Sequence, residues 1–250
     1  MGKFGLAMAV VTAIGLVGAP VAFGYEEAAV SDGGAVTGKI SFKGKVPDPQ
    51  HFLVLKNPDF CGKERDFAFV RVKDGALQNV VVVIEGIEKG KPFTHAPTEF
   101  IGKECRFLPF VSIVTKKGAD AGGWPSFKIE NMDTVIHNPH TFAVAGATRT
   151  SLFNVALPEK GSKLDKELRI RKGNVIKLEC DQHDFMHSWT RVVEHPYFAV
   201  VDDGGDFKID GVPAGKYKLV AWHPILGEQT AEVTVAAKGS AKADFTFAGK

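Results

Sequence analysis

The chain has 250 residues, enough for one large β domain or two small ones whose apolar interior folds without relying on disulfides. It carries 31 basic and 29 acidic residues and a formal net charge of +2. This near balance argues against nucleic acid or an anionic membrane as the main partner, because both require a concentrated basic face.

Residues 1–24 have the composition of a secretory signal peptide. Lys3 precedes an apolar run, residues 4–23, and the small residues Ala22 and Gly24 stand where a signal peptidase cleaves, which predicts a mature chain starting at Tyr25. An uncleaved membrane anchor is the alternative, since a run of this length can span a bilayer. We expect cleavage, a mature protein without an integral membrane segment, and a location in the periplasm or outside the cell.

The mature chain is predicted to be mainly β. Alternating or β-branched segments are separated by turns rich in Gly, Pro, Asn and Asp, and no long window keeps a helical apolar period. One or two β-sandwiches follow from this pattern. The predicted strands are 35–42, 79–84, 111–115, 126–130, 175–179, 190–193, 197–201, 216–222 and 230–235.

The C-terminal segment, residues 196–250, is a meander of short strands with tight turns. Its pattern is carried by Asp202, Gly205, Phe207, Val212, Pro213, Gly215, Tyr217 and Leu219. It resembles the carboxypeptidase regulatory-like, transthyretin-like family of small β-sandwiches, whose usual first strand is similar to residues 34–44. The resemblance implies that residues 25–97 and 196–250 form one sandwich split around residues 98–195, an arrangement we favour over a tandem one.

A set of soft ligands lies within residues 98–195. Cys180, His183 and Met186 follow one another at i, i+3 and i+6, and the upstream stretch offers His137 and His140. Thiolate and thioether favour Cu(I), and imidazole accommodates both oxidation states, so the set predicts a copper site. Zinc is a weaker choice because thioether is a poor zinc ligand.

Residues 105–194, with both of these patterns, resemble the cupredoxins of the plastocyanin and amicyanin group. The resemblance implies a Greek-key β-sandwich with one type 1 copper per chain. The trigonal ligands would be His137, Cys180 and His183, and Met186 would be the weak axial ligand. By the same resemblance Asn138 hydrogen-bonds across to the cysteine loop. His140 and His187 are the alternative ligands.

The implied function is that of an exported one-electron carrier without enzyme activity, because three strong ligands and a thioether leave no open position for substrate. Its partners would be a redox donor and acceptor, such as a c-type cytochrome or an oxidoreductase, and the electron would leave through a solvent-facing edge of His183. Asp181 and Asp184 would lower the reduction potential. The alternatives are a periplasmic Cu(I) store or chaperone, and a binding module whose copper is structural.

The chain has three cysteines. If Cys180 holds the metal, Cys61 and Cys105 are left to form a disulfide, which an oxidising compartment favours. Two separately buried thiols are the alternative.

Overall fold

The structure is a computed structural model that describes residues 25–94, 96–117 and 123–249. The predicted signal peptide, residues 1–24, lies outside the described residues. Within them the chain is almost entirely β, with a single four-residue helix, α1 (Pro58–Cys61), which confirms the predicted all-β fold class. No helix among the described residues is both long and apolar enough to cross a membrane.

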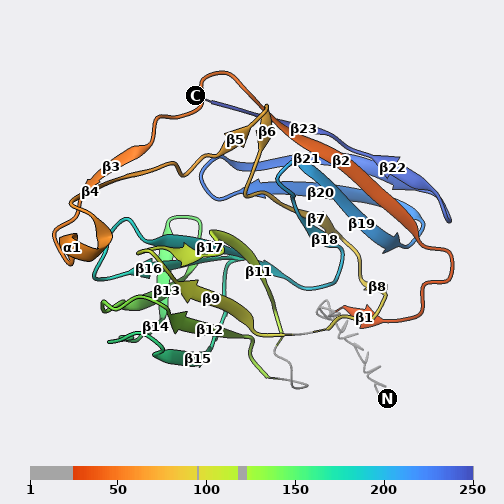
Figure 1. Ribbon diagram of the computed structural model, residues 1–250. Helices are drawn as coiled ribbons and strands as arrows, with labels where there is room; N and C mark the ends of the chain where they lie inside the picture. Colours follow the sequence, from red (N-terminus) through yellow and green to blue (C-terminus); the bar gives the residue numbers. More distant parts are fainter. Residues whose placement is uncertain (1–24, 95, 118–122, 250) are drawn as a thin grey trace, which may run out of the picture.

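Two sheets form a sandwich from the middle of the chain (Figure 1). Phe127 and Ile129 of one sheet and Ile176 and Leu178 of the other point into the same core, because alternate residues of a strand share a face. The first sheet has the order β10 (Phe107–Leu108), β9 (Thr98–Gly102), β12 (Ser126–Asn131), β15 (Lys163–Glu167). The second has the order β11 (Val111–Thr115), β17 (His187–Val193), β16 (Val175–Cys180), β13 (Pro139–Ala145), β14 (Thr148–Asn154).

A second sandwich combines strands from both ends of the described chain. β2 (Gly34–Lys43) pairs with β19 (Asp206–Val212), and β7 (Val81–Glu85) pairs with β20 (Gly215–His223). The remaining strands of these two sheets are β5 (Val72–Lys73), β6 (Ala76–Leu77), β18 (Phe198–Val200), β21 (Gly227–Val235), β22 (Ser240–Lys242) and β23 (Phe245–Ala248). A short parallel pair, β1 (Glu26–Glu27) with β8 (Lys89–Gly90), completes this part.

The run of apolar residues in β7 is explained by burial on both faces of the strand. Val82 and Ile84 face the core of the second sandwich, whereas Val81 and Val83 pack against Trp222 and other apolar residues in a separate cluster between the two sandwiches. A strand covered on both faces reads as a continuous apolar segment instead of an alternating one. The two sandwiches are therefore in apolar contact along β7.

Residues 50–67 form a separate unit, which we call the cap: β3 (Gln50–Leu53), α1 and β4 (Glu64–Phe67). Its strands pair with each other, and the cap lies over the end of the middle sandwich, at the left of Figure 1. Its buried residues Val54, Cys61 and Phe67 belong to the core of the middle sandwich. The prediction that residues 25–97 belong to the split sandwich therefore does not hold for the cap. The pattern of a strand does not reveal which core a hairpin joins.

A buried histidine in the second sandwich predicts acid sensitivity. His223 is fully buried, and burial lowers its pKa to about 4. The unfolded chain binds this proton at a pKa near 6.5. Stability contributed by neutral His223 is therefore complete above pH 6.5 and is lost as the pH falls toward 4, by up to about 3 kcal/mol. Denaturant unfolding from pH 7 to pH 4 should show a shallower loss in His223→Gln than in the wild type, and equal slopes would contradict this assignment.

Candidate metal centre

Strand pairing brings the two predicted ligand loops together. His137 forms an isolated bridge with Leu157 just before β13, and Cys180 is the last residue of β16. β13 and β16 are antiparallel neighbours whose register sets Pro139 opposite Cys180. His137 therefore lies two residues from the position that faces the cysteine.

The loop after Cys180 is closed by its own backbone. The amide of His183 donates to the carbonyl of Cys180 at 3.2 Å, and the amide of Met186 donates to the carbonyl of His183 at 3.0 Å. The amide of Cys180 donates in turn to the carbonyl of Met186 at 3.2 Å. These three bonds bend residues 180–186 into a compact ring, which explains why ligands spaced by three residues meet at one place.

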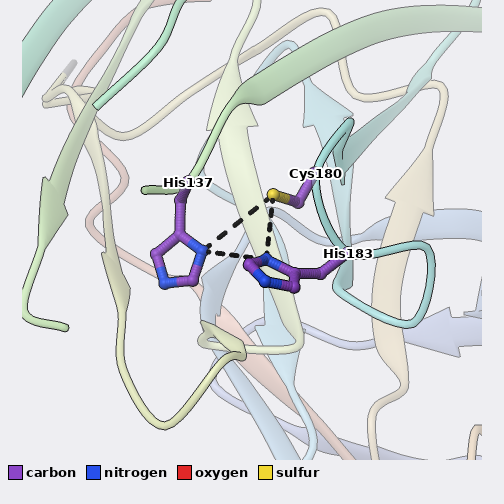
Figure 2. Close-up of side chains that lie close together, drawn as sticks. All are labelled: His137, Cys180 and His183. Atoms are coloured by element: carbon purple, nitrogen blue, oxygen red, sulfur yellow. Dashed lines mark hydrogen bonds between the residues drawn. The ribbon is translucent and has the colours of Figure 1, made fainter. Parts of the chain in front are cut away.

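Three potential ligand atoms converge in the interior (Figure 2). Nδ1 of His137 lies 3.3 Å from Nδ1 of His183, and the sulfur of Cys180 lies 4.0 and 3.7 Å from these two nitrogens. Metal bonds of about 2.0 to 2.3 Å place two ligands of one ion about 3.3 to 4 Å apart when the angles between them lie between tetrahedral and trigonal. The residues present therefore fit a single metal ion bound by two nitrogens and one sulfur.

A buried carboxylate sets the tautomer of His137. Its Nε2 lies 2.8 Å from Oδ2 of Asp133, so Nε2 carries the proton and the lone pair of Nδ1 points toward Cys180 and His183. Asp133 also accepts the backbone N–H groups of Glu104 at 2.8 Å and Cys105 at 2.9 Å. A carboxylate on the outer nitrogen is a common partner of metal-binding histidines. Asp133 was not among the predicted site residues, although it stands four residues before His137 in the sequence.

Burial keeps both imidazoles in the neutral form that binds metals. Burial lowers the pKa of His137, with a smaller opposing effect from its hydrogen bond to Asp133. Burial and the neighbouring His137 lower the pKa of His183 to about 4. Burial raises the pKa of the Cys180 thiol, so metal binding at neutral pH should release a proton from it.

Asn138 lies between the two loops and touches both sides of the site. Its backbone N–H donates to the sulfur of Cys180 at 3.3 Å, and its side-chain amide donates to Asp181 at 3.1 Å. The amide of Asp181 donates back to the carbonyl of Asn138 at 3.1 Å. Such bonds position the thiolate and hold the loops in register.

The other predicted residues occupy different surroundings. Met186 is fully buried in the core that also contains Cys180. His140 contacts Asp181 at 3.1 Å and Ser151 at 2.9 Å, and His187 stacks on Phe69. Neither His140 nor His187 belongs to the converging ligand groups found among the described residues.

The prediction that one edge of His183 faces solvent is wrong. Only 2% of this residue is exposed, because the cap covers it and the sulfur of Cys61 lies 3.5 Å from its Nε2. Cys61 is joined to Cys105 by a disulfide, and Cys180 is the free, buried cysteine. This cover was not predicted, because nothing in the sequence of residues 50–67 relates them to a loop far along the chain.

Comparisons with known proteins show no family. A family model described as "Polysaccharide lyase family 4, domain II" matches residues 174–243, which is less than half of the chain. The match runs from the last strands of the middle sandwich into the C-terminal strands. The search of curated proteins finds no match.

Solved structures with some likeness include three copper proteins. A purple cupredoxin from Nitrosopumilus maritimus is 15% identical with a TM-score of 0.29, covering 38% of this chain and 99% of that one. A copper-containing nitrite reductase from Thermus scotoductus is 16% identical with a TM-score of 0.30, covering 42% and 24%. A Cu(I) form of an amicyanin variant is 13% identical with a TM-score of 0.28, covering 45% and 98%. At such scores these likenesses establish neither family nor function.

Removing the carboxylate of Asp133 should weaken metal binding while the ligands remain. In Asp133→Asn the neutral amide no longer supports the proton on Nε2 of His137, so we expect the affinity for Cu(I) to fall about 10- to 100-fold. Competition with a chromophoric Cu(I) chelator measures this change. Asp165→Asn, an exposed carboxylate on β15, is the matched control and should bind like the wild type. An unchanged affinity in folded Asp133→Asn would contradict the role given to this residue.

Proposed function

We propose that this protein is an exported copper protein that carries one electron between redox partners. The observation that carries the proposal is the buried convergence of two imidazole Nδ1 atoms and one cysteine sulfur, 3.3 to 4.0 Å apart. Two nitrogens and a thiolate in a trigonal arrangement, with a weak thioether from Met186 as the fourth ligand, is the set that binds type 1 copper.

The chain's residues suit an ion that changes oxidation state without changing its ligands. His137, Cys180 and His183 are each at most 4% exposed, so bulk solvent would have little contact with an ion bound there. Asp133 and Asn138 hold the ligand atoms by hydrogen bonds that need not rearrange on electron transfer. Bound copper would supply a one-electron couple at this position. An ion held by these three residues and Met186 would have no open position for a substrate, so we expect no enzyme activity.

The remaining parts of the proposal come from the sequence. Residues 1–24 would direct export to the periplasm or beyond, and the electron donor and acceptor would be redox proteins such as a c-type cytochrome or an oxidoreductase. The second sandwich would be a regulatory-like β-sandwich, split around the copper-binding one. The strand pairs β2–β19 and β7–β20 support that arrangement.

A periplasmic Cu(I) store or chaperone is the second candidate, and one observation favours it. The cap and its disulfide cover the edge of His183, which lengthens the path from the metal to a docked partner. A covered site suits holding copper as well as it suits passing electrons. A Cu(II) charge-transfer band that is bleached by a mild reductant and restored by an oxidant would support the carrier, whereas binding of Cu(I) alone would support the store.

The spectrum of the copper-loaded protein tests the ligand set. We expect an intense visible thiolate-to-Cu(II) band and a matching electron paramagnetic resonance signal in the wild type. Both should be lost in Cys180→Ser, because the band requires the thiolate. His137→Gln should also lose them, whereas His140→Gln should keep them, since His140 lies outside the converging group. Metal analysis accompanies each spectrum. Retention of the wild-type spectrum by Cys180→Ser would contradict the assignment of Cys180 as a copper ligand.

A further inference from the structure

The outer nitrogens of both imidazoles are joined by a continuous chain of contacts. Nε2 of His137 binds Asp133 at 2.8 Å, and the same carboxylate accepts the backbone N–H of Cys105 at 2.9 Å. Cys105 is bonded to Cys61, whose sulfur lies 3.5 Å from Nε2 of His183. The disulfide therefore connects the supports of two metal ligands that stand far apart in sequence.

The cap contacts the ligand loop at several further points. The ammonium of Lys56 donates to the side-chain oxygen of Gln182 at 3.1 Å. The rings of Phe52 and Phe185 meet at 6.1 Å between centroids. The position of the cap thus decides whether His183 is enclosed.

Apart from these contacts and the disulfide, the cap is held by the side chains of Val54 and Phe67, which are buried in the core of the middle sandwich. β3 and β4 pair only with each other in the described part of the chain, so no sheet anchors them to the sandwich. Leu53 and Leu55 are 61% and 88% exposed, so part of the cap's apolar surface contributes nothing to its attachment. Arg65 adds hydrogen bonds to the carbonyls of Cys61 and Glu104, both at 3.0 Å and both next to or within the disulfide. A segment attached by side-chain packing without strand pairing is less firmly held once its covalent link is cut.

We propose that the Cys61–Cys105 disulfide is a reducible latch on the metal centre, and that its cleavage by a dithiol opens the cap and lets the bound copper pass to external ligands. This inference rests on the proposed copper binding. It assigns the disulfide a role in metal exchange in addition to its role in stability.

The step is an ordinary thiol–disulfide exchange. One thiolate of the dithiol attacks the sulfur of Cys61, the Cys61–Cys105 bond breaks, and Cys105 leaves as a thiolate that takes up a proton. The second thiolate of the dithiol then displaces Cys61, which also takes up a proton, and the dithiol is oxidised to its own disulfide. Copper stays Cu(I) throughout. Both half-cystines are buried, but Cys61 is 5% exposed and follows the 44% exposed Phe60 in α1, whereas Cys105 is 0% exposed. Cys61 is therefore the more accessible sulfur and the point of attack.

The rate at which a strong Cu(I) chelator removes the metal tests the latch. The full-length mature protein is loaded with Cu(I), and one half is reduced with dithiothreitol, with thiol counting to confirm two new thiols. We expect release from the reduced protein to be about 10- to 100-fold faster, because losing the outer supports of a metal site lowers its affinity by about that factor. The double variant Cys61→Ala/Cys105→Ala should release Cu(I) at this fast rate without reductant.

Two controls separate the latch from general destabilisation. Leu164→Ala opens a cavity in the same core, on β15, and should release copper at nearly the wild-type rate. Dithiothreitol should not accelerate release from the double variant, which excludes extraction of copper by the reductant itself. Circular dichroism confirms that each protein is folded.

The outcomes keep the two proposals distinct. Release at the wild-type rate from both the reduced protein and the folded double variant would overturn the latch, while leaving copper binding intact. Equal acceleration in Leu164→Ala would also overturn it, because destabilisation alone would then explain the effect. If the wild type fails to bind copper through Cys180, the proposed function fails first and the spectrum of Cys180→Ser shows it.

Discussion

The metal centre depends on the antiparallel pairing of β13 with β16. The register that sets Pro139 opposite Cys180 places His137 beside the cysteine, and a slip of one residue would turn every side chain of the strand to the other face. The ring of backbone hydrogen bonds in residues 180–186 then returns His183 to the same point. The strands on both sides of the loop thus hold three ligand atoms within 4.0 Å of each other.

The buried polar groups around these three atoms orient the ligand side chains. Asp133 is nearly fully buried, and its carboxylate is satisfied by His137 and by two backbone N–H groups of the loop that carries Cys105. A buried carboxylate left without partners would be strongly unfavourable, so this network requires all of its members. The same residue therefore fixes the tautomer of a ligand and the place of the disulfide, which links the cap to the metal site.

Much of the fold was predictable because the alternation of apolar residues in strands and the turn-forming residues between strands are visible in the sequence. The predicted strands at 111–115 and 175–179 coincide closely with β11 and β16, and the apolar run at 79–84 became β7. β14 was missed as a strand, because the polar residues of 148–154 do not show the apolar alternation of a half-buried strand. The cap was predicted to belong to the split sandwich, but its buried residues lie in the core of the middle sandwich. Its apolar residues alone do not indicate which core they join.

The sequence alone determined the fold class, which is all-β, and the potential metal ligands: a Cys-x-x-His-x-x-Met loop and an upstream histidine. These features are readable because ligand type and local spacing depend on residues close together in the chain. Only the tertiary structure decided which histidine lies beside Cys180 and which carboxylate supports it. It also decided that the cap and the Cys61–Cys105 disulfide enclose His183. The reason is physical: these contacts join segments far apart in the chain, and packing and strand register, which no local pattern encodes, bring them together.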